Sequence, residues 1–131
     1  MTKTPLNVQL TKAEEQIMQV LWELGEATVH DVREGLTEPK PARTTVATVL
    51  TILENKNFAS RTVKGRINLY MPLVSKEVYS KSQLSGLLKN YFNNSFAVMA
   101  SFFARENNYS IEEMDRMIKD TGDELNKDKT N

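Results

Sequence analysis

Residues 42–58 read ARTTVATVLTILENKNF, and this stretch has two different faces when it is placed on a helix. Apolar side chains recur at the i, i+3, i+4, i+7 spacing of a buried stripe: Val46, Val49, Leu50 and Leu53. The opposite side carries short polar groups: Thr44, Thr48, Thr51 and Asn55. Solvated helix faces are usually filled by Glu, Lys and Gln, which form helices more readily than threonine. The threonine face therefore suits close contact with another molecule, although a chance run of threonines on a solvated helix would give the same pattern.

Two further helices are predicted before this stretch, and each begins with a capping pattern. Thr11 followed by Glu14 forms a capping box, in which each side chain accepts a hydrogen bond from the backbone N–H of the other residue. Thr28 is expected to cap the second helix, with Asp31 at the third position accepting hydrogen bonds from the helix N-terminus. The short segment 26–28 between the two helices is long enough for a single edge strand.

The residues that follow the threonine-rich stretch predict a β-hairpin. Two runs, residues 60–63 and 67–71, are rich in β-branched and large apolar side chains, and Gly65 between them can take the positive φ of a tight turn. Alternation in the second run predicts one apolar face, formed by Ile67, Leu69 and Met71. Helix, short strand, helix, helix and hairpin describe a winged helix-turn-helix, which we expect over residues 10–73.

The charge of this segment differs from that of the whole chain, whose 131 residues have a formal net charge of zero. Between residues 40 and 66 there is one acid, Glu54, and six basic residues: Lys40, Arg43, Lys56, Arg61, Lys64 and Arg66. The local charge of +5 is the difference between these six bases and one acid. Basic residues at a helix and hairpin can neutralise phosphates, and this supplies most non-specific affinity for DNA.

The second half of the chain predicts a helical dimerisation domain over residues 74–126, between a flexible arm at 1–9 and a disordered tail at 127–131. Three helical segments are expected, the last from a capping box of Ser110 and Glu113. Their apolar content is too high for one small antiparallel set, so we expect these segments to pack against a second copy. The expected dimer contacts are Leu84, Leu87, Leu88, Tyr91, Phe92, Phe96, Met99, Phe102, Phe103, Met114 and Ile118.

Composition excludes several other classes of function. The chain has no cysteine, which excludes disulfides and thiolate metal sites. Neither a signal peptide nor an apolar run of about 20 residues is visible, so we expect a cytoplasmic protein without membrane insertion. His30 is the single histidine and fits no catalytic or metal-ligand pattern, and no P-loop or GxGxxG is present. We therefore expect no enzyme, metal or cofactor. Trp22, the single tryptophan, is expected to close the edge of the core.

Three motifs resemble the BlaI/MecI/CopY family of bacterial repressors: LTKAEEQIMQVLW (residues 10–22), TTVATVLTIL (44–53) and the hairpin with GRINLYMP (65–72). The resemblance extends over residues 8–125. It implies a mainly α fold, with a winged helix-turn-helix DNA-binding domain followed by a three-helix dimerisation domain. It also implies a homodimer that represses transcription at a dyad operator in double-stranded DNA. Repression would be relieved when a membrane-bound sensor metalloprotease triggers cleavage in the C-terminal domain.

The chain departs from the family pattern at several positions. Many members have arginine where this chain has Ile52, and glycine where it has Asn57. The copper-responsive branch carries a cysteine cluster, so this chain is not of that type. The β-lactam-responsive branch is cleaved after an Asn-Phe pair, and the matching residues here are Ser101, Phe102 and Phe103.

The leading interpretation is a sequence-specific repressor in which helix 42–56 enters the major groove. Threonine hydroxyls would contact phosphates, or threonine methyls would contact thymine methyls. The expected DNA contacts are Arg43, Thr44, Thr45, Thr48, Thr51, Asn55, Lys56, Arg61, Lys64 and Arg66. Two alternatives stay open. One is a winged-helix module that binds protein; the other is a ligand-sensing repressor of the MarR type, although that group usually has dimerisation helices before the winged helix.

Overall fold

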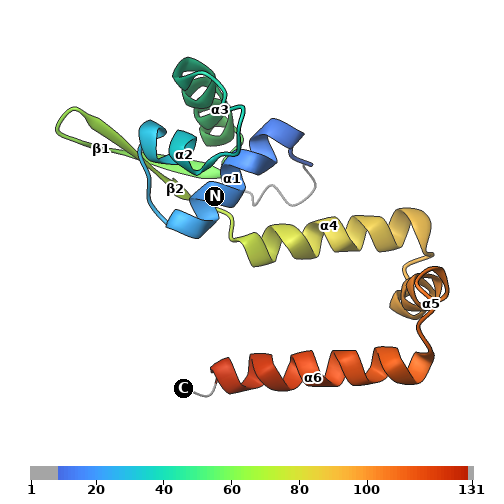
Figure 1. The fold of residues 1–131 in the computed structure, drawn as a ribbon. Coiled ribbons are helices and arrows are strands. Elements are labelled where there is room, and N and C mark those ends of the chain that lie inside the picture. The colour runs from blue at the N-terminus through green and yellow to red at the C-terminus, as the bar shows by residue number, and fades with distance from the viewer. Residues whose placement is uncertain (1–8, 130–131) are drawn as a thin grey trace. The chain divides into compact units, whose positions relative to one another are not determined.

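The computed structural model describes residues 9–129, and the side chains of α6 up to Glu124. The described residues form eight elements (Figure 1): α1 (Lys12–Leu24), α2 (Val29–Gly35), α3 (Arg43–Asn55), β1 (Ala59–Lys64), β2 (Ile67–Pro72), α4 (Lys76–Tyr91), α5 (Phe96–Glu106) and α6 (Ile111–Lys129). The chain divides into two compact units, one up to Gln83 and one from Leu84. Residues 1–8 of the expected arm and residues 130–131 of the expected tail lie outside the described residues.

The helices of the first unit begin and end where local signals predict. The Thr11 hydroxyl accepts a hydrogen bond from the Glu14 N–H at 3.2 Å, and the Glu14 carboxylate accepts one from the Thr11 N–H at 2.8 Å. Thr28 caps α2 as predicted, and the structure shows that it forms a full capping box with Asp31. Asn57, just after α3, takes a positive φ of 65°, a conformation that Asn tolerates better than most residues.

The core of the first unit lies between α1, α2, α3 and the hairpin. The stripe predicted on α3 is confirmed, because Val46, Leu50 and Leu53 are fully buried and Val49 packs against them. Burial of one side of α3 leaves the threonine side exposed. The largest fully buried side chains are Phe58, Met18, Leu21, Leu50, Leu53, Val32 and Val46.

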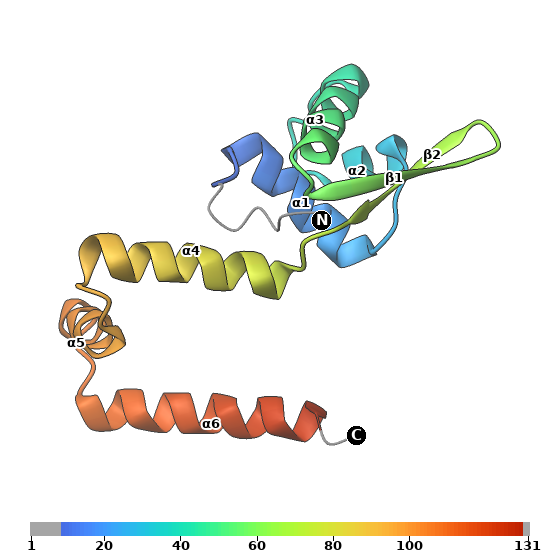
Figure 2. The same ribbon diagram turned by 180° about the vertical axis from the view of Figure 1, so that it is seen from behind.

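The two strands form an antiparallel hairpin in which Ser60 pairs with Met71 and Lys64 with Ile67. Both ribbon views show the hairpin projecting past the helices (Figures 1 and 2). Ala27 adds the predicted single edge strand, since its N–H and C=O bond to Tyr70 at 3.0 and 2.8 Å.

The apolar residues that alternate along β2 do not form the buried side of this strand. Ile67 is 55% exposed, and Leu69 and Met71 are only half-buried, whereas Tyr70 is 3% exposed. Successive strand residues point to opposite sides, and it is the side bearing Tyr70 that joins the core. The apolar residues beside it consequently lie on the more open side of the hairpin.

The start of α4 belongs to the first unit, so the division falls within this helix rather than at the expected residues 73 and 74. The Tyr79 ring lies 5.9 Å from that of Trp22 and 5.7 Å from that of Phe58. Its hydroxyl accepts a hydrogen bond from the Leu10 N–H at 2.9 Å. Trp22 donates from Nε1 to the Val74 carbonyl at 2.8 Å and closes the edge of the core as predicted.

The second unit contains the end of α4 together with α5 and α6. Asn93 and Asn94 both have positive φ and end α4, and the Ser95 side chain caps α5. Ser110 and Glu113 form the predicted capping box of α6. That helix continues to Lys129, three residues into the segment 127–131 that was predicted to be a disordered tail.

Candidate nucleic-acid interface

Every residue that the sequence predicted for the exposed face of α3 is exposed in the structure. Five predicted contacts are exposed along this helix: Thr44, Thr45, Thr48, Thr51 and Asn55. Ile52 lies on the same face and is 39% exposed. The face is therefore uncharged along its length, with short polar side chains and one apolar side chain.

Two of the threonine hydroxyls are used inside the helix. Thr48 donates from Oγ1 to the Thr44 carbonyl at 2.9 Å, and Thr51 donates to the Ala47 carbonyl at 3.0 Å. A hydroxyl has one hydrogen to donate and two lone pairs to accept with. In this arrangement both oxygens can still accept a hydrogen bond, but neither has a hydrogen left for a phosphate oxygen.

Three of the predicted cations are exposed and form no ion pair with any described residue. Arg43 is at the first position of α3, and Lys64 and Arg66 flank Gly65 at the hairpin tip. The positive φ of Gly65, 64°, makes this tight turn. These three cations are the ones available to neutralise phosphates.

The other three cations are paired within the protein, which reduces the local charge. Lys56 pairs with Glu14 at 2.8 Å, Arg61 with Glu54 at 3.6 Å, and Lys40 with Glu34 at 4.0 Å. Glu14 and Glu34 lie outside the segment from which +5 was counted. Arg33 also pairs with Glu34, at 3.9 Å, and the six bases together with Arg33 against these three acids give a local charge of +4.

Lys56 is held by the only buried charged side chain among the described residues, that of Glu14. Burial raises the pKa of Glu14, but the hydrogen bonds from Lys56 and Thr11 outweigh burial and hold the pKa below its ordinary value. The predicted role of Lys56 as a phosphate clamp is therefore not favoured by its position, since its ammonium group already ties the end of α3 to α1. The sequence revealed the capping partner of Glu14 but not this second partner.

Arg33 is a residue that the sequence did not single out. Its Nε donates a hydrogen bond to the Pro41 carbonyl at 2.7 Å and so ties α2 to the connection that enters α3. A bond between residues eight positions apart across two prolines has no periodic signal that could have predicted it. Arg33 therefore positions α3 from its N-terminal end, as Glu14 does from the other end.

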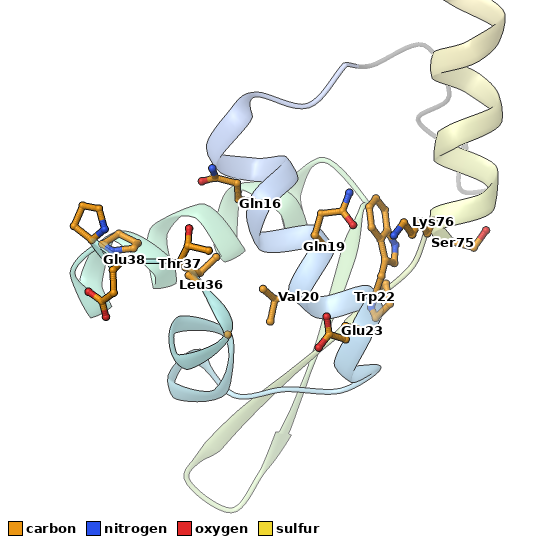
Figure 3. Close-up of a pocket in the computed structure, with 14 residues that line it drawn as sticks. Gln16, Gln19, Val20, Trp22, Glu23, Leu36, Thr37, Glu38, Ser75 and Lys76 are labelled. Carbon is orange, nitrogen blue, oxygen red and sulfur yellow. The ribbon is translucent and has the colours of Figure 1, made fainter. Parts of the chain in front are cut away.

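A groove in the first unit does not include the threonine face (Figure 3). Its described lining comes from α1, the α2–α3 connection and the start of α4, with Trp22 near Lys76 at one side and Leu36 near Glu38 at the other. None of these lining residues belongs to α3, and Pro72 at the end of β2 is the hairpin residue among them. The groove and the threonine face are thus separate features of the first unit.

The predicted dimer contacts of the second unit are exposed or only half-buried in the single chain. Among residues 84–124, Ala104 alone is buried. The exposed fraction is 74% for Tyr91, 54% for Phe96 and 46% for Phe102. Leu84, Leu87, Phe103 and Ile118 are also exposed, and Leu88, Phe92, Met99 and Met114 are half-buried. The described part of this unit therefore has almost no core of its own.

Other kinds of site find little support in the described residues. No group of three or more His, Cys, Asp or Glu side chains is placed to hold a metal ion. His30 is exposed on α2. No described helix is both long and apolar enough to cross a membrane.

The residues predicted to match the cleavage site, Ser101, Phe102 and Phe103, are exposed on α5.

Comparison with known proteins identifies the family. The family model described as penicillinase repressor matches residues 10–121. The penicillinase repressor of Bacillus licheniformis is 23% identical over 112 residues, which cover 85% of this chain and 88% of that protein. The solution structure of the DNA-binding domain of the repressor BlaI has a TM-score of 0.50 and 26% identity, and covers 60% of this chain and 94% of that one.

A second solution structure, of monomeric B. licheniformis BlaI in complex with the blaP half-operator, has a TM-score of 0.47 and 24% identity. It covers 56% of this chain and 90% of that one. The family match extends over both units and confirms the resemblance drawn from the three sequence motifs. The chain belongs to the penicillinase repressor family, a family of DNA-binding transcriptional repressors and not an enzyme class.

Proposed function

We propose that this repressor binds a dyad operator as a homodimer, with α3 of each copy in the major groove and the hairpin against flanking phosphates. The observation that carries the proposal is the exposed, uncharged face of α3, with free cations at its start and at the hairpin tip. Uncharged short side chains can approach base edges closely, while Arg43, Lys64 and Arg66 supply the phosphate contacts.

The dimer part of the proposal is supported by the second unit. Large apolar side chains on α4, α5 and α6 are exposed, and burying them against a second copy removes this surface from water. A patch of this kind is typical of an interface between protein chains. A two-fold dimer can then place two recognition helices about one duplex turn apart, ~34 Å.

Sedimentation equilibrium tests the dimer directly. We expect the full chain to be dimeric and Phe102→Glu to be monomeric, because a carboxylate would be buried in an apolar interface. Leu24→Glu is the matched control: Leu24 is 48% exposed but lies on α1 in the first unit, so this variant stays dimeric. A Phe102→Glu variant that sediments as a dimer would contradict the interface.

Titration with duplex DNA tests the DNA-binding part of the proposal. The wild-type protein is expected to bind random duplex weakly at low salt and a selected operator more tightly, and Phe102→Glu to lose affinity mainly for the two-site operator. Absence of binding to any duplex would favour a module that binds protein instead.

Release from DNA by proteolysis is the remaining part of the proposal. The family resemblance suggests it, and the residues that match the family's cleavage site are Ser101, Phe102 and Phe103 on α5. Cleavage there would separate α6 from the first unit in the chain and remove part of the dimer surface. Mass spectrometry of the repressor from induced cells, with and without the membrane-bound sensor metalloprotease, tests this step. An intact chain during induction would exclude it.

A further inference from the structure

The middle of the exposed face of α3 is more apolar than its threonine content suggests. Thr48, Thr51 and Ile52 stand at i, i+3 and i+4, and all three are exposed. The hydroxyls of Thr48 and Thr51 are turned to backbone carbonyls one turn earlier, at 2.9 and 3.0 Å. These three side chains are called the methyl ridge below.

The hydrogen bonds decide what each threonine offers to a ligand. The Cβ atom of threonine carries one hydroxyl and one methyl, and a hydroxyl that bonds to the i−4 carbonyl faces the helix backbone. Its hydrogen is then not available to a phosphate oxygen, which can only accept. The methyl is left free for an apolar contact, the hydroxyl oxygen can only accept a hydrogen bond, and Ile52 adds a wholly apolar side chain beside them.

We propose that the methyl ridge reads the 5-methyl groups of thymine in the major groove, an inference that rests on the placement of α3 in that groove. The thymine methyl is the one apolar group that a base pair presents there, and cytosine lacks it. Because the hydroxyl hydrogens of Thr48 and Thr51 are engaged and Ile52 has none, the ridge has no side-chain donor for the acceptor oxygens and ring nitrogens of the bases. Thr48, Thr51 and Ile52 therefore set a preference for T·A over C·G at the base pairs that they contact.

The test uses an operator selected from random duplexes by the full-length protein, prepared once with thymine and once with deoxyuridine throughout. Uracil lacks only the methyl, so base pairing and the minor groove are unchanged. We expect the Kd to rise roughly fourfold for each methyl that loses its contact, the effect of exposing one methyl-sized apolar group. Equal affinity for the two duplexes would overturn the inference.

Two variants at one position separate the methyl from the hydroxyl. Thr48→Val replaces the hydroxyl by a second methyl, and we expect it to keep the preference for thymine over uracil. Thr48→Ser keeps the hydroxyl and removes the methyl, so its preference should fall by about fourfold. The opposite result, in which the valine variant loses the preference and the serine variant keeps it, would assign reading to the hydroxyl.

A third variant controls for changes to a helical threonine in general. Thr121 on α6 donates to the Met117 carbonyl at 2.9 Å, the same bond as in Thr48. Thr121→Ser should leave the thymine preference at the wild-type value, and a change there would contradict a local role for Thr48. Failure to select any preferred duplex would reject the proposed function itself, whereas a selected operator without thymine preference rejects only the methyl ridge.

Discussion

The buried pair between Glu14 and Lys56 joins α1 to the end of α3, and it predicts an asymmetric response to mutation. Glu14 is 4% exposed, and its carboxylate accepts hydrogen bonds from the Lys56 Nζ at 2.8 and 3.1 Å. It also accepts the Thr11 N–H at 2.8 Å. The Lys56 side chain is 36% exposed, so water can solvate the ammonium group but barely reaches the carboxylate.

Glu14→Gln keeps the shape and the acceptor for Thr11 but removes the charge. Hydrogen bonds to charged groups contribute about 1.5–3 kcal/mol, and solvation of the freed Lys56 reduces the net loss to about 1–2 kcal/mol. Lys56→Met leaves a buried carboxylate without its charged partner, which costs about 3 kcal/mol. In the double variant the unpaired charge is gone, so it should be more stable than Lys56→Met by about 1–2 kcal/mol.

Urea unfolding followed by the fluorescence of Trp22 measures these differences. This is the single tryptophan of the chain, and it packs in the first unit beside Tyr79. The signal therefore reports on the unit that contains the pair. If Lys56→Met loses no more stability than Glu14→Gln, or if the two losses simply add in the double variant, the ion pair does not stabilise this unit as described.

Further predictions concern pH, phosphate contacts and protein assembly. Because the pKa of Glu14 is lowered in the folded protein, its contribution is present above the ordinary value of about 4.3 and is lost as the pH falls through the folded value. Urea unfolding should show wild type and Glu14→Gln differing at pH 7 and this difference shrinking as the pH is lowered below the ordinary value; a difference that does not change with pH would be contrary. Lys64→Ala should reduce the slope of log K against log salt by about one unit, whereas Arg61→Ala should change it less, because Arg61 pairs with Glu54 at 3.6 Å. Fluorescence anisotropy over a salt series measures the slope for each variant. Equal slopes for Lys64→Ala and Arg61→Ala would count against a role for the hairpin tip in phosphate binding. Tyr91→Ala removes a side chain that is 74% exposed in the single chain, so it should weaken dimerisation in sedimentation equilibrium without lowering the stability reported by Trp22.

The sequence predicted features whose partners lie close together in the chain. The capping boxes at Thr11, Thr28 and Ser110 each join residues three positions apart, so their spacing is visible without a structure. Helical periodicity likewise identified the buried side of α3. These local rules were enough to order the elements of the first unit and to find the threonine face.

The same local rules could not predict contacts between residues that are far apart in the sequence. Glu14 and Lys56 are 42 positions apart, and Leu10 and Tyr79 are 69 apart. Tyr79 joins the core only because α4 returns to Trp22 and Phe58, so the division between the units could not be placed from composition. Counting charges along the chain overstated the basic patch for the same reason.

Family membership gives Ile52 a particular interest. The resemblance places arginine at this position in many members, whereas here an exposed apolar side chain stands beside Thr48. Arginine reads guanine or phosphate through several donors, and isoleucine can offer only apolar contact.

The most direct test of the central proposal is genome-wide mapping of the DNA sites bound by the full chain in cells. We predict a dyad motif with half-site centres about one duplex turn, ~34 Å, apart, and thymines among its specified bases. A site beside a gene for a membrane metalloprotease would also support release by proteolysis. Scattered binding without a shared dyad motif would contradict a dimeric repressor that reads DNA through α3.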